Sequence, residues 1–215
     1  MQPVLEVRPL AGFALWPVAP AEPFGYLALG SDLTPLEVGA AVMSLAGVND
    51  LDLDPEHDDR PPRPADALGA FLHGLLTVDS LYAPGGLRVT DTTTGVVFQP
   101  GCCTGLEDRR DWHLVFEPGS ETFFGHDPWP RAERDGETVR LTLDAEQTDS
   151  PLIDVPAADL VKLLADAERD LLGFLVLAAE WAARQLPHYA TAVTAALGRA
   201  LDVPGAERVS GPARG

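Results

Sequence analysis

Lysine is almost missing from this sequence. Lys162 is the only lysine, and the 15 basic residues stand against 33 aspartates and glutamates, which gives a formal net charge of −18 at pH 7. A chain this acidic repels the phosphate backbone of a nucleic acid, so we expect no nucleic-acid partner. The same charge attracts cations, and we predict a basic protein as the partner.

Cysteine and long apolar runs are also scarce. The chain has two adjacent cysteines, which offer no disulfide framework and are typical of a reducing compartment. The most apolar run, residues 171–179, is far shorter than the roughly 18 residues of a membrane-spanning helix. The opening residues carry no basic and apolar signal segment. We therefore expect a cytoplasmic protein with no membrane partner, and its oligomeric state is left open.

The residues that are present favour an α+β fold. The length of 215 residues and the apolar content of 46% suit one compact domain, which we place at residues 1–205, with a flexible tail at 206–215. Asp135-Gly136 is a strong hairpin turn signal between two apolar runs. Together with other short apolar runs between turn residues, it predicts antiparallel hairpins at 4–16, 87–98 and 131–143.

Helix signals lie between and after these hairpins. Thr34-Pro35-Leu36-Glu37 combines a capping box with a proline in the first turn, and predicts a helix from Pro35 to about Ala46. A second helix is predicted at 65–76. From Pro156, an apolar stripe predicts one helix of about 30 residues, or two with a break near Gly173. A last helix beginning at Pro187 completes a long helical hairpin, and we expect all these helices to pack against a sheet made from the hairpins.

Residues 49–66 form an acidic, proline-rich segment. Its opening aspartates resemble the start of a calcium loop, but Pro55 stands where that loop requires glycine. We therefore predict a solvated loop whose carboxylates contact a basic partner. The predicted contact residues are Asp52, Asp54, Glu56 and Asp58.

Residues 96–130 concentrate the side chains that carry chemistry, including Cys102 and Cys103. Thr104-Gly-Leu-Glu107 matches a capping box and predicts a helix from about Gly105 to Phe116. At about 100° per residue, one side of this helix is apolar except for an arginine and a histidine. The residues expected on that inner side are Leu106, Arg109, Trp112, His113 and Phe116.

The two cysteines precede this helix, where open N–H groups favour a thiolate. Free cysteine is nevertheless one of the most buried residue types, so we predict that both pack as small apolar side chains and that the protein has no catalytic residue, metal or cofactor. Two alternatives stay open. Either cysteine could act as a nucleophile with His113 as its base, or could bind a metal with His113 and His126.

His126, Asp127 and Trp129 belong to a turn-rich segment, Gly125-His-Asp-Pro-Trp-Pro130, which the prolines keep out of helical conformation. Exposed aromatic side chains beside rigid loops are common contact residues. We therefore predict that these three residues form part of a binding surface.

Together, Gly101-Cys-Cys-Thr-Gly-Leu-Glu-Asp108, the 125–130 segment, the Asp-Gly hairpin and the closing Asp170-Leu-Leu-Gly-Phe-Leu helix with Trp181 resemble a family of acidic bacterial proteins from high-GC, actinobacterial-type organisms. The resemblance covers roughly residues 80 to 200. It implies a domain outline and no catalytic residue, since no activity is established for that family. Arg109-Arg110 depart from its pattern.

Two functional hypotheses follow from these patterns. The favoured one is a non-catalytic binding protein that meets a basic protein, similar in general character to immunity proteins that neutralise basic toxins. The alternative is an enzyme or sensor that depends on a thiol or a metal and uses Cys102 or Cys103 with His113.

Overall fold

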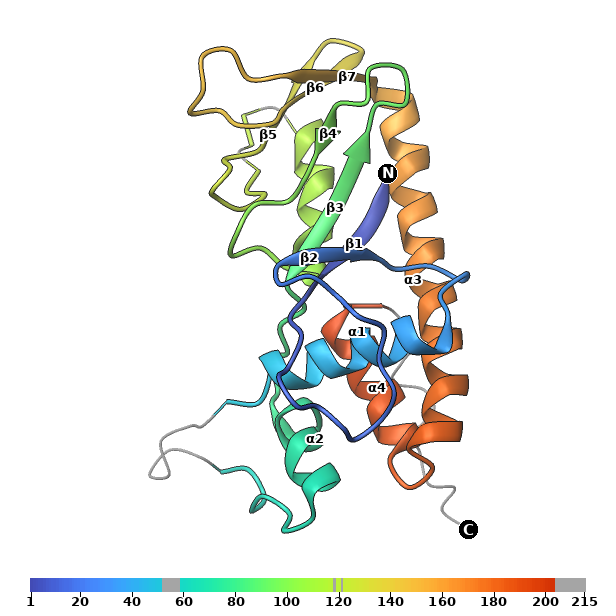
Figure 1. Ribbon diagram of the computed structural model, residues 1–215. Coiled ribbons are helices and arrows are strands. Elements are labelled where there is room, and N and C mark those ends of the chain that lie inside the picture. The colour runs from blue at the N-terminus through green and yellow to red at the C-terminus, as the bar shows by residue number, and fades with distance from the viewer. Residues whose placement is uncertain (52–58, 118, 121, 204–215) are drawn as a thin grey trace, which may run out of the picture.

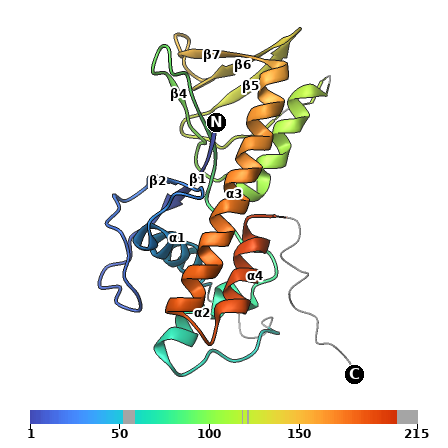
Figure 2. The same ribbon diagram turned by 90° about the vertical axis from the view of Figure 1, so that its right-hand side faces the viewer.

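A 29-residue helix, α3 (Ala157–Gln185), runs along the length of the molecule in the computed structural model, which describes residues 1–51, 59–117, 119–120 and 122–203 (Figure 1). One end of α3 lies beside a three-stranded antiparallel sheet, and the other packs on helices α1 (Pro35–Val48) and α4 (Ala190–Ala200) (Figure 2). The predicted α+β fold with a C-terminal helical pair is confirmed.

The described residues form two antiparallel sheets. The first has the order β2-β1-β3-β4, and the second has the order β5-β6-β7. The strands of the first sheet are β1 (Gln2–Val7), β2 (Gly25–Ala28), β3 (Gly85–Thr90) and β4 (Val97–Phe98). Those of the second are β5 (Arg131–Asp135), β6 (Thr138–Thr142) and β7 (Leu152–Pro156). The hairpins predicted at 87–98 and 131–143 are confirmed, and β7 was not predicted.

The hairpin predicted at 4–16 is wrong. Strand β1 pairs with β2 on one side and with β3 on the other, so residues 13–16 form no strand. Trp16 instead buries its indole ring against the helices and donates a hydrogen bond from Nε1 to the Gly39 carbonyl at 2.9 Å. Its ring lies 5.4 Å from that of Trp181. An apolar side chain that packs in this way gives the same short pattern in the sequence as a strand residue does.

The first two helices are fixed by local capping. In α1, the Thr34 hydroxyl accepts from the Glu37 amide at 3.3 Å, while the Glu37 carboxylate accepts from the Thr34 amide at 2.8 Å, so the predicted capping box is confirmed. Helix α2 (Ala67–Thr77) begins after Asp66, whose carboxylate accepts from the Gly69 amide at 2.7 Å. Both helices lie within two residues of their predicted bounds.

Helix α3 does not break at Gly173. A Cβ atom at that position would lie 2.9 Å from the Ser31 Cβ, so glycine here permits the loop before α1 to pack directly on the helix. The apolar stripe predicted from Pro156 is confirmed, since Leu160, Leu164, Leu171 and Trp181 are all buried. Strand and helix adjoin without a loop, because β7 ends at Pro156 and α3 begins at the next residue.

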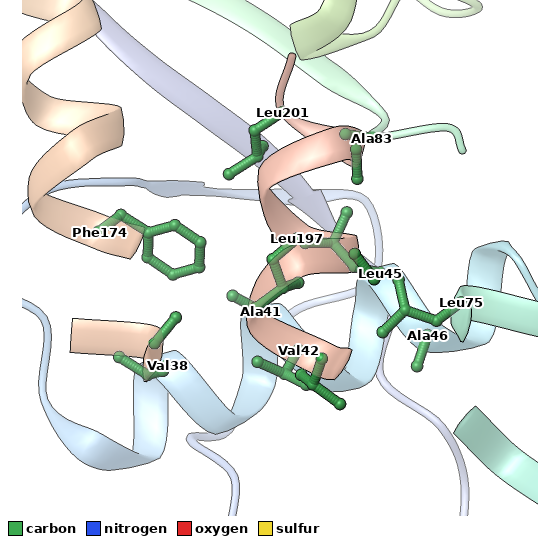
Figure 3. Packing of buried hydrophobic residues seen from close by; sticks show 14 of the residues in the cluster. Val38, Ala41, Val42, Leu45, Ala46, Leu75, Ala83, Phe174, Leu197 and Leu201 are labelled. Atoms are coloured by element: carbon green, nitrogen blue, oxygen red, sulfur yellow. The ribbon is translucent and has the colours of Figure 1, made fainter. Parts of the chain in front are cut away.

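Two hydrophobic clusters form the core, and α3 contributes to both. The first cluster joins β1 to the four α-helices and includes Leu5, Leu45, Leu75, Phe174 and Leu197 (Figure 3). The second cluster lies between β3, β4, the three-stranded sheet and the first turns of α3. It includes Phe98, Trp112, Phe124, Val139 and Leu160.

The segment after the cysteines is a 3₁₀ helix, η1 (Leu106–Phe116), and not the predicted α-helix. Its buried residues are Leu106, Arg109, Trp112 and Val115, a spacing of three that matches the three residues per turn of a 3₁₀ helix. The predicted capping box at Thr104 is also wrong, since the Gly105 amide donates to Asp108 at 3.1 Å and the Glu107 carboxylate accepts from the Ala83 amide at 3.2 Å.

Arg109 connects η1 to the C-terminal helical pair. Its guanidinium is buried, pairs with the Glu168 carboxylate of α3 at 2.8 Å, and donates to the carbonyls of Leu106, Leu201 and Asp202. The arginine predicted on the inner side of this helix is therefore buried as expected, and its partners are a carboxylate and backbone carbonyls.

Candidate functional site

Two backbone segments meet at what we call the thiol corner, residues 101–104 and 125–128. Cys102 and His126 form an antiparallel bridge, in which the Cys102 amide donates to the His126 carbonyl at 2.6 Å and the His126 amide donates to the Cys102 carbonyl at 3.0 Å. The Gly101 amide donates to the Phe124 carbonyl at 2.8 Å. These bonds hold the two segments side by side although the bridged residues lie 24 positions apart in the sequence.

Glycine makes this close approach possible on both segments. A Cβ atom on Gly101 would lie 2.5 Å from the Pro128 carbonyl oxygen, and one on Gly125 would lie 2.5 Å from the Gly101 carbonyl carbon. Gly125 also has a φ angle of +97°, which side chains rarely tolerate. Any substitution at either glycine would therefore push the two segments apart.

Both thiols are exposed, so the prediction that they pack as small apolar side chains is wrong. Cys103 has a φ angle of +65°, and its Sγ lies 3.2 Å from the Sγ of Cys102. The chain turns sharply at this point, and the apolar packing that was expected there comes instead from Leu106 and Trp112, a few residues further on.

His126, and not His113, is the imidazole beside the thiols. The Sγ atoms of Cys102 and Cys103 and a ring nitrogen of His126 all lie within 4.8 Å of one another. His113 is exposed on η1, outside this group, so its predicted place on the inner side is wrong. The reason is the 3₁₀ geometry, because a repeat of three residues turns position 113 away from the side that buries Arg109 and Trp112.

His126 is oriented by its neighbour. Its Nδ1 lies 3.1 Å from Oδ2 of Asp127, and Asp127 is otherwise free in solvent, with 86% of its side chain exposed. Asp127 has a φ angle of +51° and precedes a cis proline. The carboxylate of Asp127 therefore holds the imidazole of His126 in one orientation.

The surroundings of Cys102 favour its protonated thiol over the thiolate. Its hydrogen bond with Cys103 raises the pKa of Cys102, and the negative charges of Glu6 and Asp127 act in the same direction. A catalytic cysteine requires the opposite shift, because the thiolate is the nucleophile. The nucleophile alternative thus receives no support from the charges around Cys102.

An open cleft adjoins the thiol corner, with a volume of about 600 Å³. Cys102 lines it together with side chains from β1, β2 and the segment between β6 and β7. Its charged residues are Glu6, Arg8, Asp127 and Asp144, and its aromatic residues are Phe24 and Tyr26. We call this hollow the acidic cleft, because three carboxylates face one guanidinium.

The charges of the acidic cleft are held by neighbouring groups. Arg8 pairs with Glu6 at 2.8 Å. The pKa of Asp144 is lowered by hydrogen bonds, first from the Glu146 amide and also from the side chain of Gln147 and the amide of Trp129, so this carboxyl stays ionised. Burial raises the pKa of Tyr26, which donates its hydroxyl proton to the Pro100 carbonyl at 3.0 Å. The cleft therefore combines negative charge with a neutral aromatic wall.

Trp129 is exposed, as predicted, but lies on a different hollow. It packs edge to face against Phe123, with ring centroids 6.3 Å apart, and lines a broad basin that also includes Phe116 and Arg134. The structure thus separates two of the predicted contact residues, since Asp127 lines the acidic cleft and Trp129 lines this aromatic basin. The four predicted acidic contacts, Asp52, Asp54, Glu56 and Asp58, lie outside the described residues.

Sequence reasoning did not find the residues that complete the acidic cleft, namely Glu6, Tyr26 and Asp144. One signal was available for Glu6, which stands between two buried residues of β1 and therefore points to the other face of the sheet. Tyr26 and Asp144 carry no such signal, because only tertiary packing brings β2 next to the segment after β6.

No helix within the described residues is long and apolar enough to cross a membrane. Comparison of the chain with protein-family models, curated proteins and solved structures gives no match.

Proposed function

We propose that this is a non-catalytic binding protein that takes a basic segment of a protein partner into the acidic cleft. The observation that carries the proposal is the composition of the cleft, in which three carboxylates and two aromatic rings surround one arginine that Glu6 already neutralises. A cationic side chain entering this space would meet Asp127 and Asp144 as counter-charges.

The aromatic residues of the cleft suit the same ligand. Phe24 lines the cleft with Tyr26 and is 73% exposed, so a large apolar surface is left in contact with water. Guanidinium and ammonium groups stack on aromatic rings and bring apolar stems that cover them. A basic segment would therefore bury Phe24 while it satisfies the carboxylates.

The remaining charges support a cationic partner in general. Many basic side chains of the described residues are already paired within the chain, as in Arg140 with Asp154 at 2.9 Å and Lys162 with Asp159 at 2.9 Å. Few basic side chains of the same chain are therefore left to neutralise the excess carboxylates that give the net charge of −18. Such a surface speeds the approach of a basic protein and weakens with salt.

Neutralisation of a basic toxin, as by immunity proteins, is one form that this function could take. We further propose that the protein acts in the cytoplasm, where exposed thiols such as those of Cys102 and Cys103 stay reduced. Membership of the acidic bacterial family described above also stays a proposal, and relatives that keep both the 101–108 turn and the 125–130 segment would support it.

The proposal can be tested with a fluorescent oligo-arginine peptide at low and high salt. We expect salt-sensitive binding that Asp127→Asn weakens about 2- to 5-fold, because an exposed charge pair contributes up to about 1 kcal/mol. The matched control is Asp79→Asn, an exposed carboxylate that does not line the cleft. Equal affinities for the two variants, or binding that salt leaves unchanged, would contradict the proposal.

The alternative function, a thiol- or metal-dependent one, is favoured by a separate observation. That observation is the cluster formed by Cys102, Cys103 and His126, in which His126 occupies the place predicted for His113. It leads to the inference below.

A further inference from the structure

We propose that Cys102, Cys103 and His126 bind one divalent ion of the zinc class, through two thiolate sulfurs and one imidazole nitrogen. Three potential ligand atoms within 4.8 Å of one another carry this inference. It goes beyond the proposed binding function, because it depends on ligand chemistry at the thiol corner and not on the charge of the cleft.

The separation of the two sulfurs is close to that around a tetrahedral ion. Bond lengths of about 2.3 Å to sulfur and about 2.0 Å to nitrogen place ligand atoms about 3.5 to 3.8 Å apart around zinc. The two sulfurs are 3.2 Å apart, so they need to separate by about half an ångström to reach this geometry. Rotation of the two side chains can provide that movement, since both are exposed.

The backbone brings the ligands together before any ion binds. The paired hydrogen bonds between Cys102 and His126 fix the register of the two segments, and Gly101 and Gly125 let them approach. Cys103 reaches the same side as Cys102 through its positive φ angle of 65°. A site assembled in this way loses little conformational entropy when it binds an ion.

Asp127 contacts the ligand His126 and not the ion itself. Nδ1 of His126 lies 3.1 Å from Oδ2 of Asp127, so the tautomer with its proton on Nδ1 donates to that carboxylate and keeps the Nε2 lone pair for the ion. Histidines that bind metals commonly donate their other ring N–H to a carboxylate in this way. The predicted binding residues His126 and Asp127 thereby gain distinct roles, one as ligand and the other as a positioning residue.

The ligand set selects the class of ion. Thiolates and imidazole favour zinc and its softer relatives over magnesium or calcium, which prefer oxygen. Three protein ligands leave one position of a tetrahedral ion for water or for a group from the acidic cleft, which Cys102 also lines. Each thiol that coordinates the ion releases its proton to solvent.

The site can be tested on the reduced, metal-free full chain with cadmium chloride and zinc chloride. We expect an ultraviolet thiolate-to-cadmium charge-transfer band that saturates at one ion per chain, and protection of both thiols from a disulfide reagent by zinc. Absence of the band, or thiol modification at the same rate with and without zinc, would overturn the proposal.

Variants identify the ligands. We expect Asp127→Asn to weaken cadmium binding about 10- to 100-fold, as loss of a ligand's hydrogen-bond partner does, and His126→Ala to weaken it further. His113→Ala is the matched control and should leave the affinity unchanged. Equal affinities of the two histidine variants, or an undiminished band in Cys103→Ser, would refute the three-ligand site. Circular dichroism verifies that each variant is folded. Asp127→Asn affects both proposals, whereas Cys103→Ser leaves the carboxylates of the cleft in place and should weaken cadmium binding but not peptide binding.

Discussion

The two halves of the molecule are built differently. In the helical half, the first hydrophobic cluster is enclosed by four α-helices and β1, and its ring contacts are among Phe13, Trp16, Phe71 and Trp181. In the other half, short strands and the 3₁₀ helix enclose a smaller cluster around Phe98, Trp112 and Phe124. The thiol corner and much of the acidic cleft belong to this second half.

The difference shows that the side chains able to bind a ligand or an ion lie mainly in the second half. The helical half satisfies its backbone within helices and commits its side chains to packing. The second half also contains loop segments that a single bridge joins, as between Cys102 and His126, and it leaves thiols, carboxylates and aromatic rings in contact with solvent. Functional residues commonly lie on loops that a rigid scaffold positions, and here α3 links the scaffold to the loops.

The largest effect on stability should come from a cavity in either hydrophobic cluster. Phe174→Ala in the first cluster and Phe98→Ala in the second remove the same fully buried side chain, and each should cost about 3 to 5 kcal/mol of unfolding free energy. We expect both to shift a single urea transition, because α3 contributes to both clusters. In Phe98→Ala, a change in tryptophan fluorescence at lower urea than the loss of helical circular dichroism would mean that the second half unfolds separately, and would divide the predicted single domain in two.

The next largest effect should come from loss of Arg109, which connects the two halves. Arg109→Ala removes a guanidinium that is only 2% exposed and leaves carbonyls of Leu106, Leu201 and Asp202 without this donor. Glu168 is 41% exposed, so solvent compensates it in part, and we expect a loss of about 2 to 3 kcal/mol in urea unfolding.

Arg110→Ala provides the comparison for that measurement. Arg110 also meets Asp202, but its side chain is 53% exposed, and the loss should stay below about 0.5 kcal/mol. Similar losses for both arginines would mean that the buried connection contributes no more than a surface ion pair.

The smallest effect concerns pH and Glu107, which lies where the two halves adjoin. Burial raises the pKa of Glu107 above its ordinary value of 4.5, so the folded chain binds this proton more tightly than the unfolded chain. The stability contribution of Glu107 is therefore fully present below pH 4.5 and is lost as pH rises through the folded pKa. Glu107→Gln should remove that decline and make urea midpoints less dependent on pH in the weakly acidic range.

Glu137→Gln is a suitable control, since its side chain is 95% exposed and it changes the net charge by the same amount. The slope of stability against pH should differ from the parent chain in Glu107→Gln alone. An identical slope in both variants would place the pH dependence in the overall charge and not in the buried carboxyl.

Features fixed by neighbours in the sequence were predictable. The Thr34 capping box, the Asp135-Gly136 hairpin and the apolar stripe of α3 each depend on residues within a few positions of one another, and all three are present. The 3₁₀ helix was not predictable from the same signals, because an apolar residue every third position also fits one side of an α-helix. That single difference exposed His113 and removed it from the candidate site.

By itself, then, the sequence determined the fold class, the helices with local caps, the tight hairpin, the excess of negative charge and the segment in which the cysteines lie. Only the tertiary structure decided that β1 pairs with β2, that both thiols face solvent, and that His126 is their neighbour. The physical reason is the distance along the sequence over which each kind of interaction acts. Caps, turns and periodicity act within one or two turns of chain, whereas the meeting of Gly101 with Gly125 depends on how the whole second cluster packs.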